Sequence, residues 1–69
     1  MNITVQKMQV SGSSFVTVGD PESFTTPSGA AALGTRVKEL ANSEDASFNQ
    51  VWVKDADTGS ILMRVSAPA

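Results

Sequence analysis

The N-terminal part of the chain carries apolar residues at every second position, and the phase of this pattern changes once. Ile3 and Val5 alternate with polar residues, after which the apolar positions move to Met8 and Val10. Strict alternation is typical of a half-buried strand. The change of phase predicts a bulge or bend near residues 6–7.

A second strand follows after a short turn. Residues 11–14, Ser-Gly-Ser-Ser, predict the turn, and residues 15–18, Phe-Val-Thr-Val, are rich in aromatic and β-branched side chains. We therefore expect a hairpin over residues 1–18. Gly19 and Pro21 then predict a loop over residues 19–26, with Phe24 packed onto the core.

The middle of the chain has helical spacing. Thr26 suits an N-cap and Pro27 the first helical position, so we expect a helix over residues 27–41 that ends at a left-handed Asn42. Gly34 within it suggests a close approach of the helix to a sheet. The expected apolar face consists of Ala30, Leu33, Val37, Leu40 and Ala41.

The C-terminal part predicts a second hairpin, over residues 48–65, with a loop at residues 56–59. We expect Gly59 to take a left-handed conformation and Asp55 or Asp57 to accept backbone hydrogen bonds in the loop. We expect residues 66–69 to be a frayed tail. The expected pairs on one face are Trp52 with Met63, Lys54 with Ile61 and Gln50 with Val65, and on the other Val53 with Leu62 and Val51 with Arg64.

These elements predict one α+β domain over residues 1–69, with the order ββαββ. A four-stranded, mostly antiparallel sheet with the helix packed on one face buries one amphipathic helix and two hairpins in so short a chain. A chain of 69 residues builds only one core. The sequence leaves the order of the strands open.

With this pairing neither face of the second hairpin is polar, although a sheet covered by one helix usually has one polar face. We therefore expect the face away from the helix, or an edge strand, to bind a protein partner, with a homodimer as the first expectation. The residues expected to bind are Val51, Val53, Leu62 and Arg64. The alternatives are that the pairing is shifted by one residue or that the Phe24 loop covers this face. On the binding hypothesis, Val53→Asp weakens association and leaves the fold intact.

Trp52, the single tryptophan, has two interpretations. It is either the largest core residue, packed over the helix, or an exposed anchor for a partner. We expect the core position.

Composition narrows the chemistry. The chain has no histidine, cysteine or tyrosine, so we expect neither a disulfide nor a zinc site, and neither catalytic residues nor a cofactor. The formal net charge is −2, and the five basic residues are scattered, which argues against binding of nucleic acid. No apolar run is long enough to span a membrane and no signal peptide is recognisable, so we expect a cytoplasmic protein.

Two short motifs invite comparison with known sites. Asp55 and Asp57 begin D-A-D-T-G, but the glycine is fifth where a calcium-binding EF loop has it sixth, and Ser66 stands where that loop has glutamate. Residues 29–36, G-A-A-A-L-G-T-R, have the glycine spacing of a phosphate-binding loop without its lysine. We expect the first motif to be a turn and the second to be part of a helix.

The segment V-W-V-K-D-A-D-T-G-S-I-L-M-R-V at residues 51–65 resembles the closing hairpin of the FlaG family of flagellar accessory proteins. The helix and the first hairpin do not follow that family, so no function is carried over. A short, acidic, cysteine-free chain is also similar in kind to phage-encoded inhibitors such as anti-CRISPR proteins.

The sequence therefore favours a small, non-enzymatic protein-binding module, expected to form a homodimer. One alternative is a phage or mobile-element inhibitor of a host or defence protein. Another is a structural or accessory subunit of a phage particle or a flagellar-type assembly, for which strand pairing at sheet edges would be the physical basis.

Overall fold

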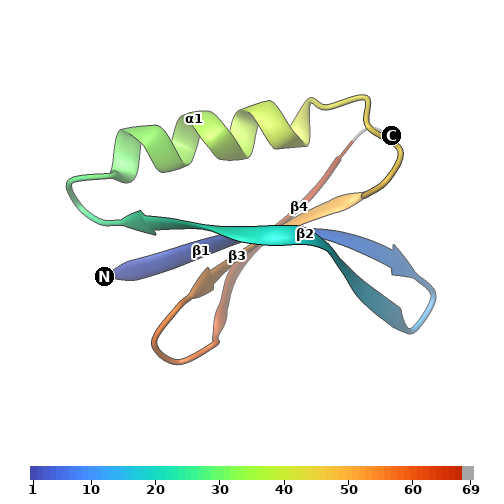
Figure 1. Ribbon diagram of the computed structural model, residues 1–69, viewed down its shortest axis with the longest axis horizontal. Helices are drawn as coiled ribbons and strands as arrows, with labels where there is room; N and C mark the ends of the chain where they lie inside the picture. Colours follow the sequence, from blue (N-terminus) through green and yellow to red (C-terminus); the bar gives the residue numbers. More distant parts are fainter. Residues whose placement is uncertain (68–69) are drawn as a thin grey trace.

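The computed structural model describes residues 1–67 and contains a single sheet with one helix on it (Figure 1). The elements are β1 (Asn2–Ser11), β2 (Ser14–Thr25), α1 (Ala30–Ala41), β3 (Gln50–Asp55) and β4 (Ile61–Ser66). The strand order is β2-β1-β3-β4, with every neighbouring pair antiparallel. The predicted α+β fold with ββαββ order is confirmed, and the two hairpins join through β1 and β3 at the centre of the sheet.

The first hairpin contains the expected irregularity, but the extra residues belong to β2. The register of β1 with β2 shifts between Val5 and Lys7, whereas β1 pairs with β3 without a break. Residues 19–21 bulge out opposite Gln6, whose side-chain amide donates to the backbone oxygens of Lys7, Val18 and Gly19 at 3.0 to 3.2 Å. The prediction of a loop over residues 19–26 was wrong, because after this bulge β2 resumes its pairing with β1 up to Thr25.

The core lies between the helix and one face of the sheet. It consists of Ile3, Val5, Val37, Leu40, Phe48, Val51 and Val53, with Val18, Phe24, Leu33 and Val65 packed around it. Side chains alternate between the faces of a strand, so the residues between these core positions lie on the other face, which we call the open face. The open face includes Thr4, Gln6, Met8, Val10, Phe15, Thr17, Gln50, Trp52, Lys54, Ile61, Arg64 and Ser66.

The helix begins later than predicted, at Ala30 with Gly29 as N-cap. Backbone groups of residues 25–30 are used by a turn, in which Gly29 N–H donates to Thr25 O and Ala30 N–H to Pro27 O. The Thr26–Pro27 peptide bond is cis and belongs to this turn. The first helical hydrogen bond runs from Leu33 N–H to Gly29 O at 2.9 Å.

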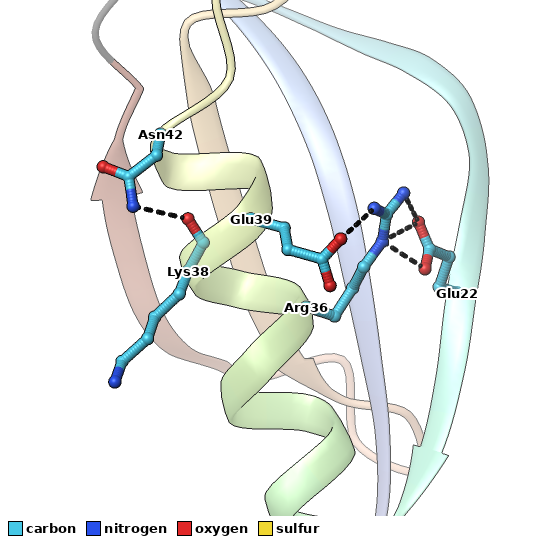
Figure 2. Close-up of polar contacts among 5 residues, drawn as sticks. All are labelled: Glu22, Arg36, Lys38, Glu39 and Asn42. Atoms are coloured by element: carbon cyan, nitrogen blue, oxygen red, sulfur yellow. Dashed lines mark hydrogen bonds and ion pairs between the residues drawn. The ribbon is translucent and has the colours of Figure 1, made fainter.

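Two further expectations about the helix were wrong. Gly34 is exposed, and a Cβ built on it would meet nothing within 4 Å, so it marks no close approach to the sheet. Asn42 ends the helix at φ −100°, outside the left-handed region. Its side-chain N–H donates to Lys38 O (Figure 2), and so does its backbone N–H. Those two bonds satisfy a terminal carbonyl without a left-handed residue.

The second hairpin has the predicted loop and a different register. Gly59 has φ +77°, and Asp55 Oδ1 accepts the N–H of Asp57 at 2.9 Å, as expected. Lys54 pairs with Ile61 as predicted, but Val53 pairs with Met63 and Trp52 with Arg64. The predicted tail begins as ordered structure, since Ala67 N–H donates to Asn49 O, and its last two residues lie outside the described residues.

Candidate interaction surface

The four residues expected to bind a partner fall in two different environments. Val51 and Val53 are 0% and 5% exposed and lie in the core beneath the helix. Leu62 is 51% exposed on β4, and Arg64 is exposed on the open face. The structure therefore brings Leu62 and Arg64 to the surface away from the core and separates them from the two valines.

A single extra residue explains this separation. The pairing of β3 with β4 shifts between Val53–Met63 and Lys54–Ile61, so Leu62 is an unpaired bulge residue. Beyond the bulge every partner of β3 differs by one residue from the expected pairing, and a shift of one residue exchanges the two faces. The alternative raised from the sequence, that the pairing is displaced by one, is thus the correct one.

Trp52 occupies neither of its expected positions: it is buried, but on the open face. Only 7% of it is exposed, because other side chains surround the indole. The Phe15 ring lies 5.5 Å from it at 56°, and the Lys54 ammonium and the Arg64 guanidinium each lie 5.6 Å from the ring centroid. The indole N–H donates to Gln50 Oε1 at 2.7 Å. Trp52 is the centre of a second, smaller group of packed side chains on the open face.

The edge of the sheet at β4 is apolar and open. Ile61, Leu62 and Met63 are 45%, 51% and 46% exposed, which places three consecutive large apolar side chains on one edge strand. The expected pairing put Met63 on one face of the hairpin and Leu62 on the other, so it did not predict an exposed apolar run along this edge. The run I-L-M beside a short loop was the signal that could have identified this edge.

The backbone of β4 presents unpaired groups along the same edge. Ala67 N–H donates to Asn49 O at 2.9 Å, and hydrogen-bonded pairs alternate along an antiparallel ladder. Val65 and Met63 therefore direct their backbone groups toward β3, and Arg64 and Ser66 direct theirs away from the sheet. An edge of this kind can pair with another strand.

The opposite edge, at β2, has features that oppose such pairing. Residues 19–21 form the bulge, which contains Pro21 and the exposed Asp20. Glu22 is held by Arg36 of the helix in three hydrogen bonds of 2.8 to 3.1 Å (Figure 2). Proline, charge and bulges are the usual means by which an edge strand avoids pairing. These features protect residues 19–22 of β2 from pairing, although Phe15 and Val16 at the other end of this strand are 54% and 56% exposed.

Residues 1–67 contain neither a pocket nor a group of three acidic side chains that could hold a metal ion. The carboxylate of Asp55 accepts a hydrogen bond within its own turn, from the N–H of Asp57. In residues 1–67 no helix is long and apolar enough to cross a membrane.

Comparison with protein-family models, with curated proteins and with solved structures finds no significant match to this chain.

Proposed function

We propose that the protein is a small, non-enzymatic protein-binding module that forms a homodimer through the edge of β4. The observation that carries the proposal is the coincidence, on one edge strand, of outward backbone groups at Arg64 and Ser66 with the exposed run Ile61–Met63. Exposed apolar side chains and unpaired strand hydrogen-bonding groups both favour association with another chain.

Two copies of β4 pair best in an antiparallel register with Arg64 opposite Ser66 of the second copy. The outward N–H and C=O groups of both residues then form four hydrogen bonds across the twofold axis. This register also avoids placing two arginines directly opposite each other, which would be destabilising. Each hydrogen bond contributes about 0.5–1.5 kcal/mol because it replaces bonds to water, so burial of Met63 and its neighbours must supply part of the affinity.

The contrast between the two edges favours a closed dimer over an extended assembly. An antiparallel pairing of β4 with itself is isologous and uses up the open edge of both copies. Continued growth would require the β2 edge, where Pro21 and the bulge at residues 19–21 oppose pairing. We therefore expect association to stop at two chains.

Sedimentation equilibrium over about a hundredfold range of concentration tests the proposal. The expected result is a mass rising from 7.2 kDa toward twice that value. Ser66→Pro removes an outward N–H and leaves the bonds to β3 in place, so it should keep the protein monomeric, whereas Ser66→Ala should dimerise normally. A monomer at all concentrations, or equal dimerisation of Ser66→Pro, would contradict the proposal.

A further inference from the structure

The open face carries charge of one sign in a chain whose formal net charge is −2. Among its described strand residues the charged side chains are Lys54 and Arg64, both cationic. Glu22 and Asp55 are paired with Val5 and Ile3 and so lie toward the helix. Asp20 is on β2, at least two strand spacings from β3, or about 10 Å. Glu22 and Asp55 thus lie on the other face of the sheet from these two cations, and Asp20 lies on another strand.

Trp52 holds both cations at one place. The Lys54 ammonium and the Arg64 guanidinium each lie 5.6 Å from the same ring centroid, which places them at most about 11 Å apart. The ion pairs among residues 1–67 are those of Arg36 with Glu22 and Glu39, so neither cation over Trp52 is paired with a carboxylate of these residues. Two like charges held close together attract an anionic partner.

The surroundings of the two cations favour a protein over a nucleic acid. The indole of Trp52 is only 7% exposed and offers no free ring for a base to stack on, and two cations neutralise few phosphates. Phe15 and Ile61, 54% and 45% exposed, provide apolar contact area beside the charges. In an extended peptide, side chains at alternate positions lie about 7 Å apart on one face, a spacing within the limit set by the two cations.

We infer that the open face is the docking surface for an acidic, extended segment of a partner protein. Carboxylates at alternate positions of that segment engage Lys54 and Arg64, and its apolar side chains contact Phe15 and Ile61. The inference goes beyond the proposed dimer. The two share Ile61 and Arg64, but the cross-chain hydrogen bonds of the dimer are made by the β4 backbone, whereas the docking contacts are made by side chains on the open face. In an antiparallel pairing of two β4 strands both open faces lie on the same side of one continuous sheet, which would double the acidic segment's docking surface.

The inference is tested by titration with a synthetic peptide of alternating Glu and Val residues. Binding is monitored by the NMR shifts of the Trp52 indole N–H and of the backbone near Arg64. The matched peptide carries Gln in place of Glu. We expect the Glu peptide to bind, the binding to weaken with added salt, and the Gln peptide to bind about tenfold more weakly. Equal binding of the two peptides, or no binding of the Glu peptide, would overturn it.

Variants locate the site. The double variant Lys54→Gln with Arg64→Gln should bind the Glu peptide about tenfold more weakly than the wild type. The single variant Arg64→Lys, which keeps the charge, should retain most of the wild-type binding. Lys38→Gln, which removes one positive charge from an exposed position of the helix, should have no effect. An equal effect of Lys38→Gln, or tighter binding of an oligothymidylate than of the peptide, would refute the assignment. Ser66→Pro should bind the peptide, which separates this test from that of the dimer.

Discussion

Arg36 on the helix and Glu22 on β2 form a bidentate ion pair that ties the helix to the edge of the sheet (Figure 2). The two side chains are 36% and 37% exposed, and Glu39, one turn along the helix, adds a longer contact of 3.8 Å. The hydrogen bonds from Arg36 hold the pKa of Glu22 below its usual range. The pair therefore connects protonation of one carboxylate to the stability of the fold.

Glu22→Gln should lower the free energy of unfolding at neutral pH by about 0.5–1 kcal/mol, a value limited by exposure of the pair to solvent. Because the pKa of Glu22 is lowered by folding, the stability it contributes is fully present above its ordinary value near 4.5 and is lost as the pH falls through the folded value. Urea unfolding at neutral and acidic pH should thus show a difference between wild type and variant that disappears in acid. The exposed Glu44 gives the charge control, and an equal effect of Glu44→Gln would show that net charge is responsible.

Gly29, the N-cap of the helix, and Gly34, inside the helix, should respond oppositely to alanine. A Cβ on Gly29 would lie 2.6 Å from the backbone oxygen of Thr25, so Gly29→Ala should destabilise the protein by about 1–3 kcal/mol. Gly34 is exposed with open space around it, and Gly34→Ala should stabilise by about 0.5–1 kcal/mol through helix propensity. Thermal unfolding of the two variants measures both effects. Destabilisation by Gly34→Ala would mean that the helix packs against something at this position.

Gln6 should not tolerate a carboxylate. Its amide donates to three backbone oxygens at the bulge, and Gln6→Glu places a negative charge against them. We expect a loss of roughly 1–3 kcal/mol or more at neutral pH, larger than for Gln6→Met, which removes the hydrogen bonds without adding charge. Since protonation removes the charge, the loss caused by Gln6→Glu should shrink in acid. Wild-type stability of Gln6→Glu would show that the bulge does not depend on this amide.

Val53→Asp should unfold the protein. From the sequence we expected this change to weaken association only, but Val53 is 5% exposed in the core beneath the helix. A domain of this length has a stability of a few to about 10 kcal/mol, and an unpaired carboxylate in its core costs a large part of that. Far-ultraviolet circular dichroism should show loss of structure for Val53→Asp and a native spectrum for Leu62→Asp, because Leu62 is 51% exposed. A folded Val53→Asp protein would be inconsistent with the position of this strand.

The element types could be predicted because periodicity and turn residues act locally. The sequence shows the change of apolar phase in β1, but the predicted bulge explains only part of this change. Ile3 and Val5 lie under the helix, whereas Met8 is buried on the open face, so the change records two apolar layers on opposite faces of a strand that stays regular toward β3. Trp52 was expected in the larger layer, beneath the helix, because nothing in the neighbouring sequence indicates a second layer on the other face of the sheet.

The register of the second hairpin could not be obtained in this way. Lys54 with Ile61 was correct, and the bulge at Leu62 displaced the remaining pairs. A bulge depends on how the whole strand fits the twisted sheet, and nothing in I-L-M-R-V shows which residue is left out. The candidate binding residues were chosen from the expected register, and that register was wrong. Arg64 and Leu62 are therefore on the surface, whereas Val51 and Val53 belong to the core.

The most direct test of the proposed dimer is amide hydrogen exchange of Arg64 and Ser66 at two protein concentrations about a hundredfold apart. In the monomer both N–H groups point away from the sheet and should exchange fast, whereas the N–H of Val65, directed toward β3, should be protected throughout. In the proposed dimer the N–H groups of Arg64 and Ser66 become protected together at the higher concentration. Fast exchange of both amides at both concentrations, with Val65 protected, would contradict it.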